Sequence, residues 1–427
     1  VRVLLSREGW RGFFLFLFSY NLKTIFMKTL RNLSLCLLAL MMLIPAMAQD
    51  KKEKKEKKAY QFEIIKKIPT TSVKNQYRSG TCWSFCTISM LESELLRLGK
   101  GKYDLSEMYV VRNAYESKAQ RYVRMHGKIN FTGGGATNDV MDVFKNSGIV
   151  TEEAYSGLLS GEKKHIHGEM DEVLKEYVDG VLENKNKKLS PAWYLGFEGL
   201  LDAYLGVEPE DFSYEGKEYD AITYAESLEI NPDDYVLISS FTHHPFYEEF
   251  ILEVPDNWSC VTAYNLPLDE MIDVFYSAIE DGYTLSWATD VSERGFSWYN
   301  GIAMVPDIDK PDLKGTEREK WEELSTSEKE ASVYSFREPV TEKMITQEIR
   351  QRAFDNFETT DDHGMHIIGT AKDQNGTPYF IVKNSWGTGN KLNGYLYASE
   401  EYVKYKTISV MVNKNAIPPK IRKKLGI

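Results

Sequence analysis

Residues 75–85 read NQYRSGTCWSF, and this stretch decides how the rest of the chain is interpreted. Cys82 follows a glycine turn. Apolar side chains then recur at spacings of three and four residues, at Phe85, Ile88, Leu91, Leu95 and Leu98. This spacing predicts a helix over residues 82–98. The N–H groups at a helix N-terminus stabilise a thiolate and can bind an oxyanion. The sequence therefore predicts a reactive thiol at Cys82, with the side-chain amide of Gln76 as a second oxyanion donor.

A base for this thiol and a residue to orient that base occur late in the chain. His363 follows Asp361 and Asp362 and begins a predicted strand, and Asn384 ends the next strand. The turn Asn375-Gly376 between them favours a hairpin, which would bring the two strands side by side. A neutral imidazole can take the thiol proton, and an amide oxygen can hold its other N–H and fix the tautomer.

The remaining pattern predicts an α+β fold, with helices early and antiparallel strands late. Further helices are expected at 106–124, 138–146, 171–182, 268–280 and 316–330. Strands are expected at 283–291, 363–372, 378–384, 394–397 and 407–413.

The charge of the chain argues against binding to a nucleic acid. The net charge is −11, and residues 1–48 carry six basic side chains and one acidic side chain, so the rest of the chain carries −16. A phosphate backbone requires a basic surface. We therefore expect no nucleic-acid partner.

These motifs resemble the papain-like cysteine peptidases. The segments around Cys82, His363 and Asn384 occur in the order of that family, from about residue 70 to the C-terminus. In two respects the sequence departs from the secreted members of the family and resembles the bleomycin hydrolase and aminopeptidase C branch. Ser79 stands where secreted members usually have a cysteine, and His363 lies 281 residues after Cys82 rather than ~130–150. The resemblance implies a helical subdomain that carries the cysteine, an antiparallel β subdomain that carries His363 and Asn384, and a large central insertion at about 160–345.

The resemblance also implies roles for individual residues. Cys82 is the expected nucleophile, His363 the base and then the acid, and Asn384 the orienting residue. Gln76 is the expected oxyanion donor, and Trp386 the expected cover of the His363–Asn384 pair. The expected approach of the substrate backbone is at Gly134 and Gly135.

The same branch implies a role for the C-terminal arm, residues 414–427. In that branch the tail lies in the cleft, so that the terminal carboxylate faces the amino group of the substrate and peptides are trimmed from the N-terminus. Members often form hexameric rings, so a homo-hexamer is expected.

The N-terminus is typical of an export signal. Residues 27–48 have a basic start, an apolar run from Leu33 to Ile44 and a small-x-small cleavage site at Ala46-Met47-Ala48. We interpret residues 1–26 as an upstream extension from a misplaced start codon, with an anchor around Phe13–Phe18 as the alternative. Residues 49–59 are expected to be a charged, disordered spacer before the peptidase domain at 60–427. The expected location is the periplasm or the medium, without a stable membrane span, and the cytoplasm is the family-typical alternative.

The other cysteines and histidines are expected to be structural. Cys86 and Cys260 are interpreted as packing residues, and His366 as a strand residue that faces away from His363. The pairs His165/His167 and His243/His244 have no carboxylate or cysteine at a known metal spacing. No metal or cofactor is therefore expected.

The sequence favours an exported cysteine aminopeptidase that cleaves peptides through a thioester. Two alternatives remain. The same site could serve an endopeptidase or a hydrolase of small amides, or the protein could be an inactive papain-like binding protein.

Overall fold

The structure is a computed structural model that describes residues 59–159, 161–309 and 313–427. The expected signal at 27–48, the extension at 1–26 and all but the last residue of the spacer lie outside the described residues. Among the helices that are described, none is long and apolar enough to cross a membrane.

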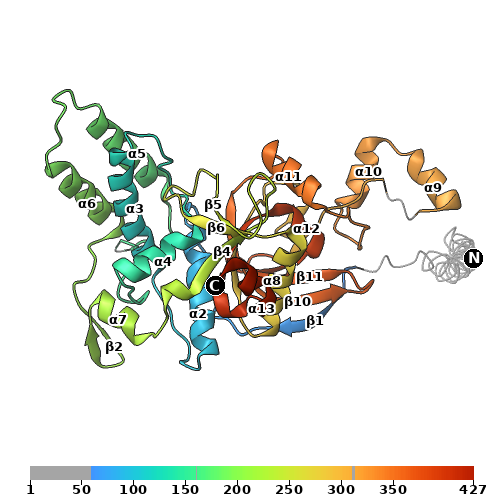
Figure 1. The fold of residues 1–427 in the computed structure, drawn as a ribbon, viewed down its shortest axis with the longest axis horizontal. Helices are drawn as coiled ribbons and strands as arrows, with labels where there is room; N and C mark the ends of the chain where they lie inside the picture. The colour runs from blue at the N-terminus through green and yellow to red at the C-terminus, as the bar shows by residue number, and fades with distance from the viewer. Residues whose placement is uncertain (1–58, 160, 310–312) are drawn as a thin grey trace, which may run out of the picture. The chain divides into compact units, whose positions relative to one another are not determined.

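Twelve α-helices and thirteen strands lie in the described part of the chain (Figure 1). The helices are α2 (Cys82–Arg97), α3 (Glu107–Arg124), α4 (Thr137–Asn146), α5 (Gly168–Leu182), α6 (Ala192–Leu205), α7 (Ala221–Ser227), α8 (Leu268–Glu280), α9 (Gly315–Glu322), α10 (Thr326–Val333), α11 (Gln347–Asp355), α12 (Glu400–Lys406) and α13 (Pro419–Leu425). The strands are β1 (Phe62–Lys67), β2 (Phe212–Tyr214), β3 (Lys217–Tyr219), β4 (Tyr235–Ser239), β5 (Glu249–Ile251), β6 (Thr262–Asn265), β7 (Leu285–Thr289), β8 (Phe296–Ser297), β9 (Ile302–Ala303), β10 (His363–Asp373), β11 (Pro378–Lys383), β12 (Tyr395–Ser399) and β13 (Thr407–Asn413).

The main sheet is built around β10, which confirms the α+β class. Its order is β5-β6-β4-β13-β7-β10-β11-β12-β9-β8, and β1 also pairs with β10. The pairs that flank β10 are antiparallel, whereas β4–β6 and β9–β12 are parallel. The sequence predicts one strand in the central part of the chain, at 283–291, and the structure has more strands there. The central part of the chain contributes β4 to β9 to this same sheet, because these short strands complete its two sides.

The hairpin between β10 and β11 forms as its turn residues predict. Gly376 has a φ of +86°, which a residue with a side chain rarely adopts. The carboxylate of Asp373 accepts the N–H groups of Asn375 (2.8 Å) and Thr377 (2.9 Å), which closes the turn. The hairpin brings His363, at the start of β10, close to Asn384, the residue after β11.

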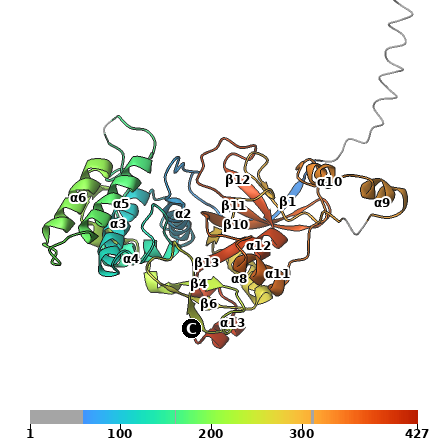
Figure 2. The ribbon, with the colours of Figure 1, turned by 90° about the horizontal axis from the view of Figure 1, so that it is seen from above.

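Helix α2 lies between the helical part of the fold and the sheet (Figure 2). It contacts β10 and β7 on one side and α3 and α4 on the other. Because it is enclosed on both sides, all of its residues from Trp83 to Leu95 are buried. The predicted apolar stripe is present, and several buried polar side chains on the other faces make hydrogen bonds to their neighbours. Thr87, for example, bonds Ser286 of β7.

One predicted helix is divided in two. Residues 316–330 were expected as a single exposed helix, but α9 ends before Ser325 and α10 begins after it. The hydroxyl of Ser325 accepts the N–H of Glu328, whose carboxylate accepts the N–H of Ser325. This reciprocal capping starts a new helix at that point.

Candidate active site

Cys82 is the first residue of α2, as the sequence predicts. The first backbone hydrogen bond of this turn runs from the N–H of Ser84 to the carbonyl of Thr81, at 3.0 Å. The N–H groups of Cys82 and Trp83 come before this bond in the chain. The start of β10 lies directly against this turn. A Cβ atom on Gly364 would come within 2.8 Å of Sγ of Cys86, so only glycine fits where the strand meets the helix.

His363 and Asn384 are joined by a hydrogen bond. Nε2 of His363 lies 2.8 Å from Oδ1 of Asn384, and the same oxygen accepts the N–H of Ser385 at 2.7 Å. An amide oxygen only accepts, so Nε2 carries the imidazole proton and Nδ1 is the acceptor of the ring. The Trp386 ring covers this pair, with its centroid 4.5 Å from that of His363.

One cavity brings the two reactive groups together. Its wall includes Cys82, His363 and Gly135, although the first two lie 281 residues apart in the chain. The remaining lining residues are Trp83, Ala136, Thr137, Asn138, Leu237, Leu252, Val254, Asp256, Asn257, Ala288, Asp361, Asp362, Gly364 and Ser409. The cavity therefore holds a thiol and an imidazole beside three acidic side chains, Asp256, Asp361 and Asp362, to which the sequence analysis did not assign a role.

Burial favours the neutral forms of both reactive groups. It raises the pKa of Cys82 well above its usual range, and nearby Asp361 and Asp256 add to this effect, whereas a hydrogen bond from the backbone of Gly364 opposes it. Burial also lowers the pKa of His363 to about 4, and the bond to Asn384 works in the other direction. In the closed cavity the imidazole is therefore neutral and able to accept a proton at neutral pH.

Gln76 lies against Ser385, next to Asn384, and is not among the residues that line the cavity. Its Oε1 accepts the hydroxyl of Ser385 at 2.6 Å, and its Nε2 donates to the carbonyl of Ser79 at 2.8 Å. A carboxamide nitrogen has two protons, so one N–H remains beyond the bond to Ser79. This arrangement is compatible with the expected oxyanion role and does not itself place a donor on a substrate.

The glycine run at 133–135 is packed tightly rather than open. A Cβ atom on Gly135 would lie 2.8 Å from Cε2 of Trp83. A Cβ atom on Gly134 would lie 2.6 Å from Cγ of Asp256. The ammonium group of the buried Lys118 donates hydrogen bonds to the carbonyl groups of Thr132 and Gly134. Gly134, where the resemblance implies contact with substrate backbone, is thus covered by an acidic side chain.

Two expectations about the remaining cysteines have different outcomes. Cys86 is buried in the packing of α2, with its Sγ 3.1 Å from Oγ of Ser286. Cys260 is exposed, so its interpretation as a buried packing residue is wrong. It follows Trp258 and Ser259 in a loop and has a φ of +56°, a turn conformation that directs it outward.

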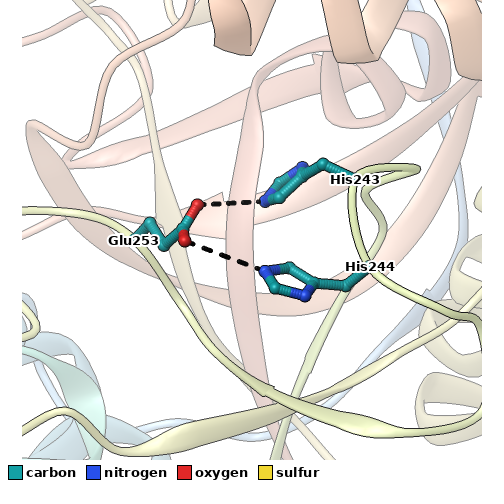
Figure 3. A group of neighbouring side chains, drawn as sticks. All are labelled: His243, His244 and Glu253. Carbon is teal, nitrogen blue, oxygen red and sulfur yellow. Dashed lines mark ion pairs between the residues drawn. The ribbon is translucent and has the colours of Figure 1, made fainter.

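The structure adds a carboxylate to the pair His243 and His244. Both rings face Glu253, whose oxygens lie 3.4 and 3.8 Å from the two Nε2 atoms (Figure 3). Nδ1 of His243 receives a hydrogen bond from Nε2 of Gln351, whose Oε1 is fixed by the N–H of Thr242. His243 therefore carries its proton on Nε2, toward Glu253. To bind a metal, Nε2 of His243 would have to be unprotonated, and Nδ1 would carry the proton and donate it to an acceptor. Gln351 instead donates to Nδ1, so this bond counts against a metal here.

The comparisons with known proteins agree with this geometry. The profile described as papain family cysteine protease matches residues 59–194 and 331–414, which is more than half of the chain. The chain belongs to the papain family of cysteine proteases. The first matched segment contains Cys82, and the second contains His363 and Asn384. Asp256 lies between the two segments.

Members of the papain family with similar sequences include two named aminopeptidases. Aminopeptidase G from Lactobacillus delbrueckii subsp. lactis is 20% identical over 395 residues, 81% of this chain and 82% of that protein. Aminopeptidase C from Listeria innocua serovar 6a is 21% identical over 392 residues, 81% of each. The fold is similar to the crystal structure of pepw from Lactobacillus rhamnosis, with a TM-score of 0.64, 17% identity and coverage of 85% of this chain and 84% of that one.

One expectation from the papain family resemblance is wrong. The C-terminal tail does not lie in the cavity of Cys82, since none of the residues 414–427 lines it. Figure 2 shows the C-terminus beside α13. Ile421 and Leu425 are buried in the same apolar cluster as residues of α8. Lys424 pairs with Glu270 of α8. The tail is held there by an apolar face that the sequence analysis did not use.

Proposed function

We propose that this papain-family member is a cysteine aminopeptidase. The observation that carries the proposal is the cavity lined by Cys82 and by His363, whose Nε2 lies 2.8 Å from Oδ1 of Asn384. The relatives named aminopeptidase G and aminopeptidase C support the exopeptidase part, because the match covers about four fifths of each protein. Peptides with a free N-terminus are the proposed substrates.

The geometry supports an acyl transfer in two halves. Sγ of Cys82 attacks the scissile carbonyl carbon while its proton passes to Nδ1 of His363. The oxyanion receives hydrogen bonds from the first turn of α2 and, in this proposal, from Gln76. His363 then protonates the leaving amine as the C–N bond breaks, which leaves a thioester on Cys82. Water attacks the thioester with His363 as base, and the acid product and free thiol are released.

Because the thiol of Cys82 and the imidazole of His363 are both neutral before the reaction, His363 acts as a general base. Because burial favours a neutral thiol and a neutral imidazole, the proton moves as the substrate carbonyl is attacked. Asn384 keeps the ring in the tautomer whose Nδ1 can accept that proton. Trp386 covers the pair, and exclusion of water strengthens the bond between them.

Replacement of the nucleophile tests this assignment. We expect Cys82→Ala to abolish turnover of an aminoacyl fluorogenic amide, with an unchanged thermal midpoint. Cys260→Ser is the matched control, because Cys260 is exposed and lies outside the cavity. Equal activity in Cys82→Ala and the wild type would contradict thiol catalysis. No turnover in the wild type on any peptide amide would favour the inactive binding protein instead.

Export and assembly complete the proposal. Residues 27–48 support export through cleavage after Ala48, and N-terminal sequencing of the mature protein tests this. A homo-hexamer rests on the resemblance to the bleomycin hydrolase branch, and light scattering after gel filtration measures it directly.

A further inference from the structure

We propose that Asp256 and Asp361 form the site that binds the α-ammonium group of the substrate. We refer to these two residues as the acidic pair. This inference rests on the proposed aminopeptidase function and assigns the group that selects a free N-terminus. Both side chains line the cavity that contains Cys82 and His363, so a cation bound between them lies beside the scissile bond.

Asp256 closes the cleft on the side of the glycine run. Its carboxyl group occupies the space directly over Gly134, where a Cβ atom would lie 2.6 Å from Cγ. An extended peptide cannot run along Gly134 while this side chain is there. The acyl side of the substrate therefore ends near Asp256, which leaves room for a terminal residue and none for a long chain.

The loop that carries Asp256 is firmly held. Nδ2 of Asn257 bonds the carbonyl groups of Leu252 and Val261, both at 2.9 Å. The indole N–H of Trp258 donates to Oδ2 of Asp139 at 2.7 Å. The same oxygen accepts the N–H of Ala136 at 3.0 Å, directly after the glycine run. This chain of bonds fixes the position of Asp256 relative to Gly134.

Few donors within the described residues reach the acidic pair. Asp256 accepts a hydrogen bond from Asn130 at 2.9 Å. It is also near the ammonium group of Lys118, whose charge interacts with Asp139 and Asp171 as well. Among the described residues, no hydrogen bond or ion pair reaches the carboxylate of Asp361. Its neighbours Asp256 and Asp362 are themselves acidic.

A neighbouring acceptor is also unpaired. Asn138 lines the same cavity and is only 6% exposed. Its Nδ2 donates to Asp139 and Ser259, but its Oδ1 has no donor within the described residues. Buried acceptors are nearly always paired in native proteins. An ammonium group has three protons, which matches the two carboxylates and this amide oxygen.

The acidic pair takes over the task that the family resemblance implied for the C-terminal carboxylate. The tail lies at α8, whereas Asp256 comes from the central part of the chain, outside the two segments that match the family profile. The substrate class that follows is peptides and aminoacyl amides with a free, protonated α-amine. N-acylated peptides lack this charge and meet the closed end of the cleft at Asp256.

The test compares an aminoacyl fluorogenic amide with its N-acetylated twin in the wild type, Asp256→Asn and Asp361→Asn. A charged hydrogen bond of about 1.5–3 kcal/mol corresponds to a roughly 10- to 100-fold change. We therefore expect kcat/KM for the free amine to fall by about this factor in each variant, while the acetylated substrate is not slowed. Glu253→Gln is the matched control. It removes the same charge three residues from Asp256, outside the cavity, and should leave both rates unchanged.

The outcomes separate this inference from the proposed function. If the wild type prefers the free amine and both Asn variants keep that preference, the acidic pair is not the amine site although the aminopeptidase proposal holds. If the wild type shows no preference for the free amine, the aminopeptidase proposal itself fails.

A second measurement needs only the wild-type protein. The thiol at Cys82 is modified with 2-aminoethyl methanethiosulfonate, which is cationic, and with the neutral methyl reagent. The exposed Cys260 in the same molecule is the reference, and mass spectrometry of the two peptides gives both rates. We expect the ratio of the cationic to the neutral rate to be at least about 10-fold higher at Cys82 than at Cys260, because the acidic pair attracts the ammonium group of the cationic reagent. Equal ratios at the two thiols would overturn the inference.

Discussion

Oδ1 of Asn384 lies 2.8 Å from Nε2 of His363, and the same oxygen accepts the N–H of Ser385. The backbone bond fixes which end of the amide faces the ring. The amide in turn fixes which ring nitrogen carries the proton. The bond therefore determines that Nδ1 is the acceptor available to the thiol.

Asn384→Ala should lower kcat/KM for an aminoacyl amide by at least about 10-fold, since it removes the group that holds the productive tautomer. Substrate binding does not use Asn384, so we expect the effect mainly in kcat. Steady-state kinetics measures this, with the thermal midpoint as a check on folding. A change confined to KM would contradict the orienting role.

Gly364→Ala should destabilise the fold by about 1–3 kcal/mol, because the new methyl group would overlap Sγ of Cys86 and push β10 away from α2. Gly180→Ala in α5 is the matched control. A Cβ atom there meets nothing within 4 Å, and alanine in a helix is favoured by about 0.5–1 kcal/mol. Urea unfolding measures both. Equal stability of the two variants would show that the contact between β10 and α2 is not tight.

The acidic pair predicts a pH dependence specific to substrates with a free amine. Burial, with Asp256 and Asp362 nearby, raises the pKa of Asp361 to about 8. In the empty cavity Asp361 is therefore protonated at neutral pH, and it must lose this proton to pair with an ammonium group. As pH rises toward 8 more of the protein has an ionised Asp361, so kcat/KM should rise. Above ~8 the substrate amine itself loses its proton, so kcat/KM should fall.

The control for this pH profile is Asp361→Asn, which has no proton to lose. Its kcat/KM should be lower than that of the wild type near pH 8 and should lack the rise between about pH 6 and 8. Identical profiles for the wild type and this variant would show that the ionisation of Asp361 does not limit substrate capture.

Removal of Gly426 and Ile427 should leave the preference for a free amine unchanged. These two residues lie beyond Leu425, the last side chain of the tail that packs into the core near α8. Hydrolysis of the free and acetylated amides by the truncated chain measures this. A gain of endopeptidase activity on truncation would mean that the C-terminal carboxylate reaches the cleft and limits cleavage to the N-terminus.

Much of the fold near the thiol could be predicted because its signals are local. The apolar spacing after Cys82 predicted α2, and the turn at Asn375-Gly376 predicted the β10–β11 hairpin. The strands β4 to β6 and β8 to β9 could not be predicted in the same way. They have only two to five residues each, too few for a clear alternation. They form by pairing with distant strands, β4 with β13 and β9 with β12, and β6, β5 and β8 extend these pairs.

The acidic pair shows a different limit. Asp361 was visible beside His363, but its role depends on Asp256, which comes from a loop 174 residues after Cys82 and has no periodic pattern around it. Packing of that loop against α4 brings the two carboxylates into one cavity. The prediction that the C-terminal tail lies in the cleft was wrong because it followed the resemblance and not the local apolar pattern. Ile421 and Leu425 lie four residues apart and form the apolar face of a short helix.

The most direct test of the aminopeptidase account is hydrolysis of an aminoacyl fluorogenic amide against its N-acetylated twin. Protein that begins at Gln49 is assayed under reducing conditions, with Cys82→Ala as the blank. The account predicts cleavage of the free amine at least about 10-fold faster than cleavage of the acetylated twin, with both lost in Cys82→Ala. Equal or faster cleavage of the acetylated twin would contradict it and identify an endopeptidase.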